Sequence, residues 1–379
     1  MRRSAQDQRA ALCQVLALLR RGRICSRSAL AKAIGASAST LGLQVTALMQ
    51  AGLVIETGAA KGLAPGRPQR RLALAPQAGC FLGLEFNAQR IQTALLDFSG
   101  NLQATQQQGI AALAGRAQVL QALEQAITTA LQTTRASLLA IGVAAPGLVD
   151  RDRGMAMRSS VIADWLAVPL AEKIRQRFGC EVTVENNLRV IALAERWFGA
   201  ASELEHFAVL GPRSGLGMGV VSHGQLLRGA HHSAGEIGLW PWPGDKGNLT
   251  LQDELSATAI YRRLCGQEPS GHQAIALRDF FTSHPCSEWP ETARQSIVGD
   301  FARLLRSVQV MMDLQCFFLH GPLTALGPEF CEAITACAAT LPPRWPELTP
   351  PRLEPSSLGD EAGALGAATL AMEHWQPEV

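Results

Sequence analysis

One pattern of strands occurs twice in this chain, and it constrains the fold more than any other feature. Apolar strands joined by tight turns are expected over 80–84, 91–97 and 102–106, and helical spacing follows over 118–133. The second copy has strands over 207–210 and 220–221 and a third that starts at Leu226, with a glycine-rich turn over 211–219. Two such units, each followed by helices, predict a duplicated α/β fold with two lobes and a cleft between them.

The stretch 182–197 changes from strand to helix character at three polar residues. Alternating β-branched residues predict a buried strand, and the apolar positions from Leu188 onward have helical spacing. Glu185, Asn186 and Asn187 stand at the change, which in open α/β sheets is the edge where ligands bind. Helix capping is the simpler interpretation, because Asn is among the best N-cap residues. The spacing alone leaves both interpretations open.

Basic residues are concentrated at the start of the chain. Residues 1–78 contain twelve Lys and Arg against only Asp7 and Glu56, a net charge of +10. The remainder has 22 basic and 30 acidic residues, or −8, although the whole chain carries only +2. A basic segment on an acidic body indicates contact with a polyanion. A solvated basic surface is the alternative.

The first 78 residues are typical of a winged helix-turn-helix. Ser26 and Ser37 can cap helices, and Gly35 provides the turn between them. A turn rich in Gly, Ala and Pro then joins two short strands that form the wing. The expected elements are helices over 11–21, 27–34 and 38–51 and strands over 53–55 and 70–74.

The third helix would enter the major groove of DNA with its first turns over the base edges. It carries no Lys or Arg, so phosphate contacts must come from the second helix and the wing. Gln44 can bond to adenine through both of its side-chain polar atoms. A protein-interaction module is the alternative, which the charge of +10 disfavours. The expected DNA-contacting residues are Arg27, Ser37, Ser39, Thr40, Leu43, Gln44, Lys61, Arg67, Arg70 and Arg71.

Composition places the protein among globular proteins of the cytoplasm. At 379 residues the chain is long enough for two or three domains, and 47% of it is apolar. Its nine cysteines form no C-x-x-C pair, and their odd number favours reduced thiols. No apolar run approaches membrane-spanning length, so we expect no membrane association.

Together these residues resemble the ROK family of repressors, open reading frames and kinases. The resemblance implies an actin-like sugar-kinase fold behind the DNA-binding head. It implies a head over 1–78 and a ROK domain over 79–379, with one lobe at 79–195 plus 359–379 and the other at 196–358. The motifs that carry it lie at 66–68, 140–147, 185–187, 194–200, 227–231, 234–238 and 358–368.

Two motifs for phosphoryl transfer depart from the family pattern. In the family's kinases the strand-to-helix motif is Glu-Asn-Asp, and the Asp is the general base; here that position is Asn187. An amide does not accept the proton at neutral pH, and losing a positioned base costs about 10²–10⁴ in rate. The first phosphate loop, usually Asp-x-Gly-Gly-Thr, reads Glu85-Phe86-Asn87-Ala88-Gln89, and Pro212-Arg213 is inserted before the second loop. We therefore expect a protein that is not an enzyme and does not bind ATP.

The family's structural zinc site is also absent from the sequence. Leu239 replaces its His, and Gly, Lys and Leu stand at its three Cys positions in 244–251. Zinc needs about four N or S ligands, so we expect no metal and no other cofactor. Apolar packing by Leu239, Trp240, Trp242 and Leu251 is expected to hold this segment instead.

The sugar pocket of the family is kept in part. By resemblance Asn186, Asn187 and Glu236 fall on sugar-contact positions, and Asp253 replaces a Glu in the same role. The sequence thus predicts a DNA-binding transcriptional repressor of carbohydrate metabolism, a homodimer or homotetramer, whose inactive ROK domain senses a sugar or sugar derivative. Alternatives are a residual ATP-dependent sugar kinase with a DNA-binding head, and a regulator controlled by a protein partner without a small ligand.

Overall fold

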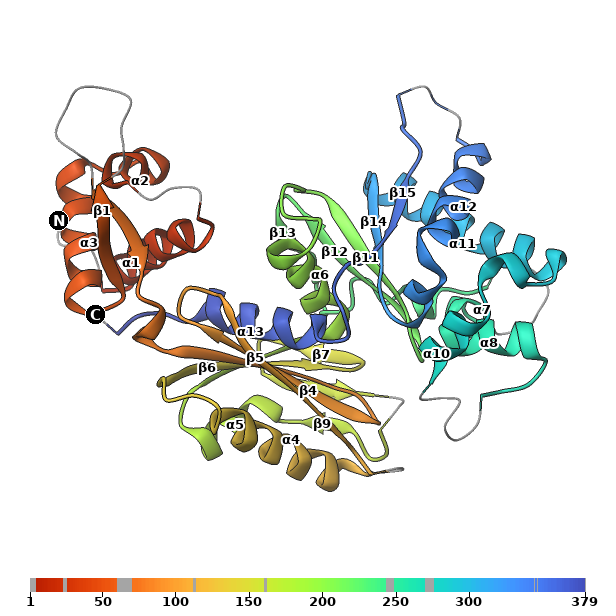
Figure 1. Ribbon diagram of the computed structural model, residues 1–379, viewed down its shortest axis with the longest axis horizontal. Coiled ribbons are helices and arrows are strands. Elements are labelled where there is room, and N and C mark those ends of the chain that lie inside the picture. The colour runs from red at the N-terminus through yellow and green to blue at the C-terminus, as the bar shows by residue number, and fades with distance from the viewer. Residues whose placement is uncertain are drawn as a thin grey trace.

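The computed structural model describes residues 5–22, 26–59, 70–111, 114–159, 162–242, 249–269, 276–343, 345 and 347–378. A helical head stands at one end, and two lobes of mixed sheet and helix follow it (Figure 1). Of the described helices, none has the length and apolar character needed to cross a membrane.

The head has the predicted order of three helices and a two-stranded wing. Ser26 and Ser37 accept hydrogen bonds from backbone N–H groups at the starts of the second and third helices, and Gly35 ends the second helix at a φ of 64°. The apolar faces meet in a core that includes Leu16, Leu30 and Val45. The elements are α1 (Ala5–Arg20), α2 (Arg27–Ile34), α3 (Ala38–Gln50), β1 (Val54–Ala59) and β2 (Arg70–Leu74), with the 3-10 turn η1 (Pro76–Ala78) leading out.

The first lobe is a five-stranded sheet in the order β10-β6-β3-β4-β5. Three antiparallel strands come first, and two parallel strands are added beside β3. Its elements are β3 (Cys80–Phe86), β4 (Arg90–Asp97), β5 (Leu102–Gly109), α4 (Arg116–Leu131), β6 (Leu138–Ala145), α5 (Leu170–Phe178) and β10 (Glu181–Asn186), with a small sheet of β7 (Leu148–Asp150), β8 (Met155–Arg158) and β9 (Leu166–Val168).

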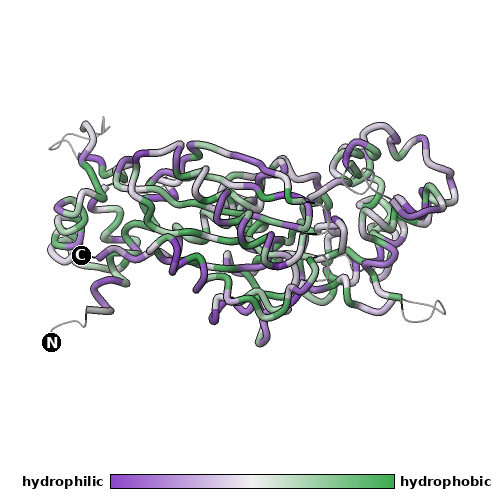
Figure 2. Tube along the Cα trace, turned by 90° about the horizontal axis from the view of Figure 1, so that it is seen from below, coloured by the Kyte–Doolittle hydropathy of each residue, from purple (hydrophilic) through white to green (hydrophobic). Residues whose placement is uncertain are grey.

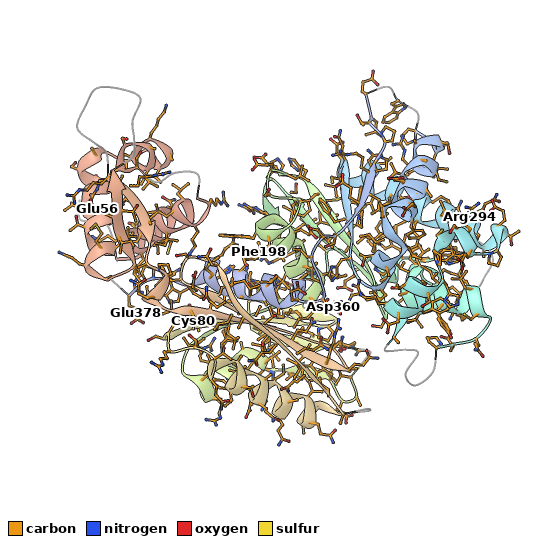
Figure 3. All side chains as sticks on the ribbon, in the orientation of Figure 1. Glu56, Cys80, Phe198, Arg294, Asp360 and Glu378 are labelled. Carbon is orange, nitrogen blue, oxygen red and sulfur yellow. The ribbon has the colours of Figure 1, made fainter. Side chains whose placement is uncertain are left out.

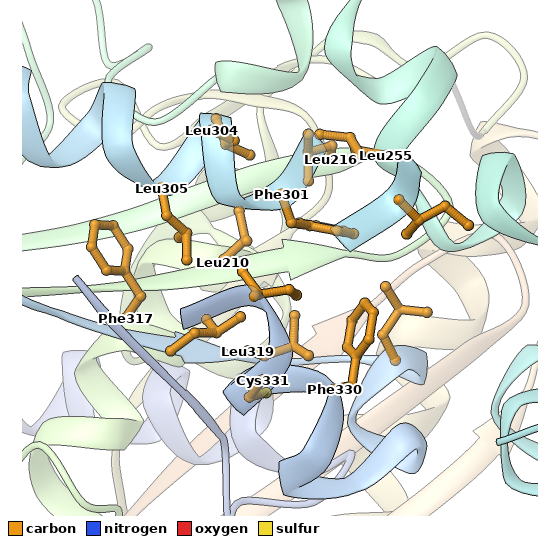
Figure 4. Close-up of a cluster of buried hydrophobic side chains, with 14 of the residues drawn as sticks. Leu210, Leu216, Leu255, Phe301, Leu304, Leu305, Phe317, Leu319, Phe330 and Cys331 are labelled. Carbon is orange, nitrogen blue, oxygen red and sulfur yellow. The ribbon is translucent and has the colours of Figure 1, made fainter. Parts of the chain in front are cut away.

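The second lobe repeats that topology in the order β13-β12-β11-β14-β15. Again three antiparallel strands are followed by two parallel ones, which confirms the predicted duplication. Figure 4 shows the core of this lobe, where Phe301 and Phe330 pack near Leu210 and Leu319. The strands are β11 (Phe207–Pro212), β12 (Leu216–Ser222), β13 (Gln225–Leu226), β14 (Cys316–Leu319) and β15 (Arg352–Pro355). The helical elements are η2 (Ile237–Leu239), α7 (Leu251–Leu255), α8 (Ala257–Cys265), α10 (Leu277–Ser283), η3 (Cys286–Glu288), α11 (Glu291–Met312), η4 (Pro322–Leu326) and α12 (Gly327–Thr340).

Two helices, α6 (Asn187–Phe198) and α13 (Ala362–His374), join these parts through glycine contacts. A Cβ on Gly142 of β6 would lie 1.8 Å from the carbonyl oxygen of Ala367 in α13. A Cβ on Gly366 would lie 1.8 Å from that of Val190 in α6. Only glycine permits such approach of backbone to backbone. Figure 2 shows apolar segments running through the middle of the molecule as well as through its two ends.

The prediction of a glycine-rich turn over 211–219 is wrong for most of that stretch. Residues 207–212 and 216–222 are two paired strands, and only the short connection between them turns. The glycines of β12 are needed for packing, since a Cβ on Gly219 would lie 2.2 Å from the carbonyl oxygen of Leu188. The third strand of this lobe is also shorter than expected and ends at Leu226.

We expect Gly142→Ala to destabilise the protein because the added methyl group meets the backbone of α13. Overpacking of this kind costs about 1–3 kcal/mol, which urea unfolding followed by circular dichroism would measure. Gly109→Ala is the control in the same sheet, where the nearest atom to a new Cβ is 3.9 Å away. Equal unfolding midpoints for the two variants would contradict the close approach.

Candidate DNA-binding surface and sugar cleft

The first turns of α3 present the predicted base-reading residues together. Leu43 is 76% exposed and Ser39 is also exposed, whereas Gln44 is half-buried. Ser37 is the N-cap: its hydroxyl oxygen accepts a hydrogen bond from the Thr40 amide at 3.1 Å and lies 2.9 Å from the hydroxyls of Ser39 and Thr40. The apolar Leu43 therefore stands at the surface beside a cluster of hydroxyl groups.

A carboxylate links two of the predicted phosphate contacts, and sequence reasoning did not find this pairing. Glu56 of β1 accepts hydrogen bonds from Arg27 at 3.1 Å and from Arg70 at 2.7 Å. These hydrogen bonds, that of Arg70 first, lower the pKa of the Glu56 carboxyl. Figure 3 shows Glu56 on the head. Arg71 lies in β2, and Lys61 and Arg67 lie outside the described residues.

The polar junction between β10 and α6 serves as a cap. The Asn186 side-chain oxygen accepts hydrogen bonds from the amides of Leu188 at 2.9 Å and Arg189 at 3.4 Å, and its NH₂ donates to the Gly147 carbonyl at 2.9 Å. The Asn187 side-chain oxygen also lies 2.9 Å from the Leu188 amide. Capping thus accounts for Asn186 but leaves the Asn187 NH₂ group for other contacts.

Glu185 is buried completely and held by two guanidinium groups. Its carboxylate accepts hydrogen bonds from Arg189 at 2.9 Å and from Arg228 at 2.7 Å, and one from the Asn186 amide at 2.9 Å. Burial raises the pKa of Glu185, but the attraction of the two arginines is stronger in sum and the pKa is lowered. Arg189 lies in the stretch 182–197 and Arg228 in the motif at 227–231, but the sequence alone predicted no role for either arginine.

Three of the four predicted sugar-contact residues gather around Arg189. Its guanidinium donates to the Ala234 carbonyl at 3.0 Å, which places the segment that contains Glu236 beside Asn186 and Asn187. Burial raises the pKa of Glu236, and Arg189 partly offsets that rise. The structure therefore places Asn186, Asn187 and Glu236 near Arg189, where the sequence predicts the sugar site.

Asp253 has a different environment. One of its carboxylate oxygens accepts hydrogen bonds from the amide and the hydroxyl of Thr250, both at 2.8 Å, in a capping box at the start of α7. It lines a separate cavity of about 210 Å³ with Ser214, Gly215 and Arg262. This cavity adjoins the second glycine loop.

Ion pairs lie where the resemblance implies nucleotide phosphates. Arg213, from the insertion before the second loop, donates to Glu85 of the first loop at 2.5 Å. Asp360 pairs with Arg90 at 2.6 Å and with Arg278 at 3.3 Å, and Figure 3 shows it between the lobes. Asp360 directly precedes Glu361, which holds the N-cap position of α13.

His320, beside these ion pairs, is fully buried. Burial first and then the positive charge of Arg213 lower the pKa of His320 to about 3, so its imidazole is neutral near neutral pH. Any phosphate placed at the first loop would meet the carboxylate of Glu85, whose Oε2 is buried without a hydrogen-bond partner. At the first loop a carboxylate paired with Arg213 thus lies where a phosphate would need hydrogen-bond donors.

The described residues do not fit a zinc ion. No three His, Cys, Asp or Glu side chains among them come close enough together to hold a metal. Leu239, at the family's His position, is 63% exposed. The expectation that Leu239 packs inward is therefore wrong, whereas Trp240 and Trp242 do pack against the core with the buried Leu251.

The fold and the site define an actin-like, two-lobed protein that carries a winged-helix head. The ROK family model matches residues 81–374, and the chain belongs to the ROK family. The xylose repressor of Bacillus subtilis (strain 168) is 26% identical over 366 residues, which are 92% of this chain and 91% of that repressor. The xylose repressor of Caldicellulosiruptor bescii is 27% identical over 59% of this chain. The matched part of this chain spans 56% of that repressor, little more than half of the repressor's length.

Solved structures show the same fold. A ROK family transcriptional regulator, a homolog of the Escherichia coli MLC protein, superposes with a TM-score of 0.79 at 21% identity over 97% of both chains. A ROK family glucokinase from Streptomyces griseus in complex with glucose and AMPPNP superposes with a TM-score of 0.64 at 22% identity. That match covers 77% of this chain and 99% of the glucokinase.

We expect Glu185→Gln to lower stability at pH 7 by about 3–5 kcal/mol, since it leaves the buried Arg189 and the half-buried Arg228 without their charge partner. The pKa of Glu185 is lower in the folded than in the unfolded state, so the stability that its carboxylate contributes is present above its ordinary pKa of 4.5 and is lost as pH falls through the lowered value. The difference between variant and wild type should therefore shrink in acid.

Urea unfolding at pH 7 and at about pH 4 tests this dependence. Glu181→Gln is the matched control, because this exposed residue lies in the same strand and its loss should change stability by less than about 0.5 kcal/mol. A deficit in Glu185→Gln that stays constant with pH would show that the carboxylate is not the source of the stability.

Proposed function

We propose that this protein is a DNA-binding transcriptional regulator of carbohydrate metabolism that acts as a repressor. The observation that carries the proposal is the alignment with the B. subtilis xylose repressor, which spans the head as well as the lobes. The exposed start of α3 and the charge of +10 on residues 1–78 support it, because they offer a reading helix and an attraction for phosphate.

The proposal divides the chain into a DNA-binding domain over 1–78 and a ROK domain over 79–379. One lobe comprises 79–195 plus 359–379 and the other 196–358, with the sugar cleft between them. The described cysteines are free thiols, which supports a place in the cytoplasm. A homodimer or homotetramer would present two heads to a DNA operator of matching symmetry.

In this proposal the ROK domain binds a sugar or sugar derivative and does not phosphorylate it. Asn187 stands at the position of the general base and cannot take a proton at neutral pH. The Arg213–Glu85 ion pair, 2.5 Å long, occupies the region of the phosphate loops. Asn186, Asn187 and Glu236 would contact the sugar, and Asp253 would do so only if the cleft closed toward α7. Neither zinc nor ATP has a part in this function.

Sugar binding would control DNA binding by a shift of population. A ligand held between the lobes favours the arrangement in which both lobes contact it, because it binds that arrangement more tightly. Because α13 packs on the first lobe and the head packs on α13, a change of lobe angle changes the relative placement of two heads in a dimer.

The DNA claim predicts that Glu56→Gln binds a selected operator more tightly and with a steeper salt dependence. The substitution removes the carboxylate that holds Arg27 and Arg70, so both can bind phosphate. Each added phosphate contact should raise the slope of log K against log salt by about 0.9, so we expect an increase of about 1–2. Fluorescence anisotropy at several salt concentrations, on a duplex selected from a random pool, measures it.

Glu124→Gln is the matched control, because Glu124 is exposed on α4 in the first lobe and its loss changes the net charge equally. An unchanged slope in Glu56→Gln would show that these arginines do not reach DNA. Failure of the wild-type protein to select any salt-sensitive duplex would overturn the proposed function itself.

The sensing claim predicts that at least one sugar raises the melting temperature while none supports ATP consumption. A hexose and pentose panel with thermal shift and ATP-hydrolysis readouts measures both. Glu236→Gln should weaken the apparent affinity for that sugar about tenfold and so reduce the shift in melting temperature, since a charged hydrogen bond contributes about 1.5–3 kcal/mol. ATP turnover abolished by Asn187→Ala would establish the kinase alternative, and a panel without any shift would favour control by a protein partner.

A further inference from the structure

A pocket of about 340 Å³ lies where the head meets the lobes. The end of α1 forms one wall, and α6, β13 and the end of α13 form the others (Figure 1). We call it the junction pocket, and its polar lining that matters here consists of Arg20, Arg21, Arg196, Arg228 and Glu373. Asn186, Asn187 and Glu236 do not line it, so it is separate from the sugar cleft.

The junction pocket is strongly cationic. Four guanidinium groups line it, and Glu373 is the one carboxylate among its described lining residues. That carboxylate is already engaged, because it accepts a hydrogen bond from the Trp197 indole at 2.9 Å. Burial and then repulsion from Arg21 lower the pKa of Arg196, which shows that positive charges crowd each other here. An anion would relieve that repulsion.

Arg20 presents hydrogen-bond donors that have no acceptor. Its Nη1 donates to the Met372 carbonyl at 2.9 Å, whereas Nε and Nη2 are buried without a partner. The guanidinium lies 5.4 Å from the ring centre of Phe81 and 5.1 Å from that of Phe98, so it is held in place by aromatic faces. Buried donors of this kind are rare unless a ligand or ion supplies the acceptor.

We propose that the junction pocket binds a small organic anion that carries a phosphate or carboxylate group. Planar guanidinium groups match these oxyanions with paired hydrogen bonds. Trp197, Leu226 and Trp375 line the same pocket, are only partly buried, and offer apolar surface for the rest of such a molecule. The volume falls at the lower end of the roughly 300–1,000 Å³ of small-molecule sites.

The bound anion would fix the head against the lobes. Arg20 and Arg21 belong to the head, whereas Arg196 and Arg228 belong to the lobes, so one oxyanion contacts both parts. Arg228 also donates to Glu185 at 2.7 Å, and Glu185 begins the motif of the sugar cleft. Arg228 therefore connects the junction pocket to the strand-to-helix motif of the cleft, and through it each site can alter the other's affinity. The effect on DNA rests on the proposed function; the binding itself does not.

Isothermal titration of the DNA-free protein tests the binding. The probes are inorganic phosphate, glucose 6-phosphate and gluconate, with glucose as the uncharged control. We expect saturable binding of one anion per chain, weakened at high salt and about tenfold weaker in Arg21→Gln, which changes an exposed side chain. The relative affinities of the three anions decide between phosphate and carboxylate.

Arg135→Gln is the control for net charge, because Arg135 is an exposed residue of the first lobe. Glu236→Gln distinguishes the sites: it should weaken sugar binding in the cleft and leave inorganic phosphate binding unchanged. Absence of saturable binding by all three anions, or equal binding by Arg21→Gln and Arg135→Gln, would overturn the proposal. Neither outcome depends on whether the protein binds DNA, so the two claims can fail separately.

Discussion

The buried carboxylate of Glu185 is the interaction on which the arrangement of the lobes depends. A fully buried charge is tolerated only when it is paired and hydrogen-bonded. Here the partners come from both sides of the cleft, Arg189 from α6 and Arg228 from the segment after β13. Arg189 also donates to the carbonyl groups of His232 and Ala234. Any movement of the second lobe that removed Arg228 would leave this charge half-paired, so the cleft has a small set of stable positions.

A second set of ion pairs acts near the other loops of the cleft. Glu85 pairs with Arg213 and Asp360 with Arg278, and these two contacts again cross between the lobes, whereas the Asp360–Arg90 pair lies within the first lobe. In a kinase the charged side chains at the phosphate loops must be free to contact the phosphates of the nucleotide and its metal ion. Here these side chains pair with one another instead, which favours the proposal that a sugar without a nucleotide decides between open and closed arrangements.

The elements of the fold could be predicted from sequence because their signals are local. Ser26 and Ser37 cap the helices they were expected to cap, and the repeated strand pattern predicts the duplicated sheet. The stretch 211–219 could not be predicted, because glycine is typical of turns and the cause here is packing against Leu188 from a helix 20 or more residues earlier. Likewise, no local rule pairs Glu56 with Arg27, or Glu185 with Arg228 across 43 positions. Contacts between distant residues need the tertiary structure.

The position of Arg228 gives the proposed sensing a physical route to the head. Its guanidinium is bonded to Glu185 at the sugar cleft and also lines the junction pocket beside the end of α1. A sugar that changes the charge or geometry around Glu185 changes what Arg228 offers to an anion, and the anion changes how α1 is held. Linkage requires that the effect be reciprocal: whatever factor the sugar applies to anion affinity, the anion applies to sugar affinity. Such coupling needs no long pathway through the core, because Arg228 lines the junction pocket and pairs with Glu185, the first residue of the cleft motif. Arg228 is thus the residue through which the proposed sugar site and the proposed anion site beside the head would exchange free energy.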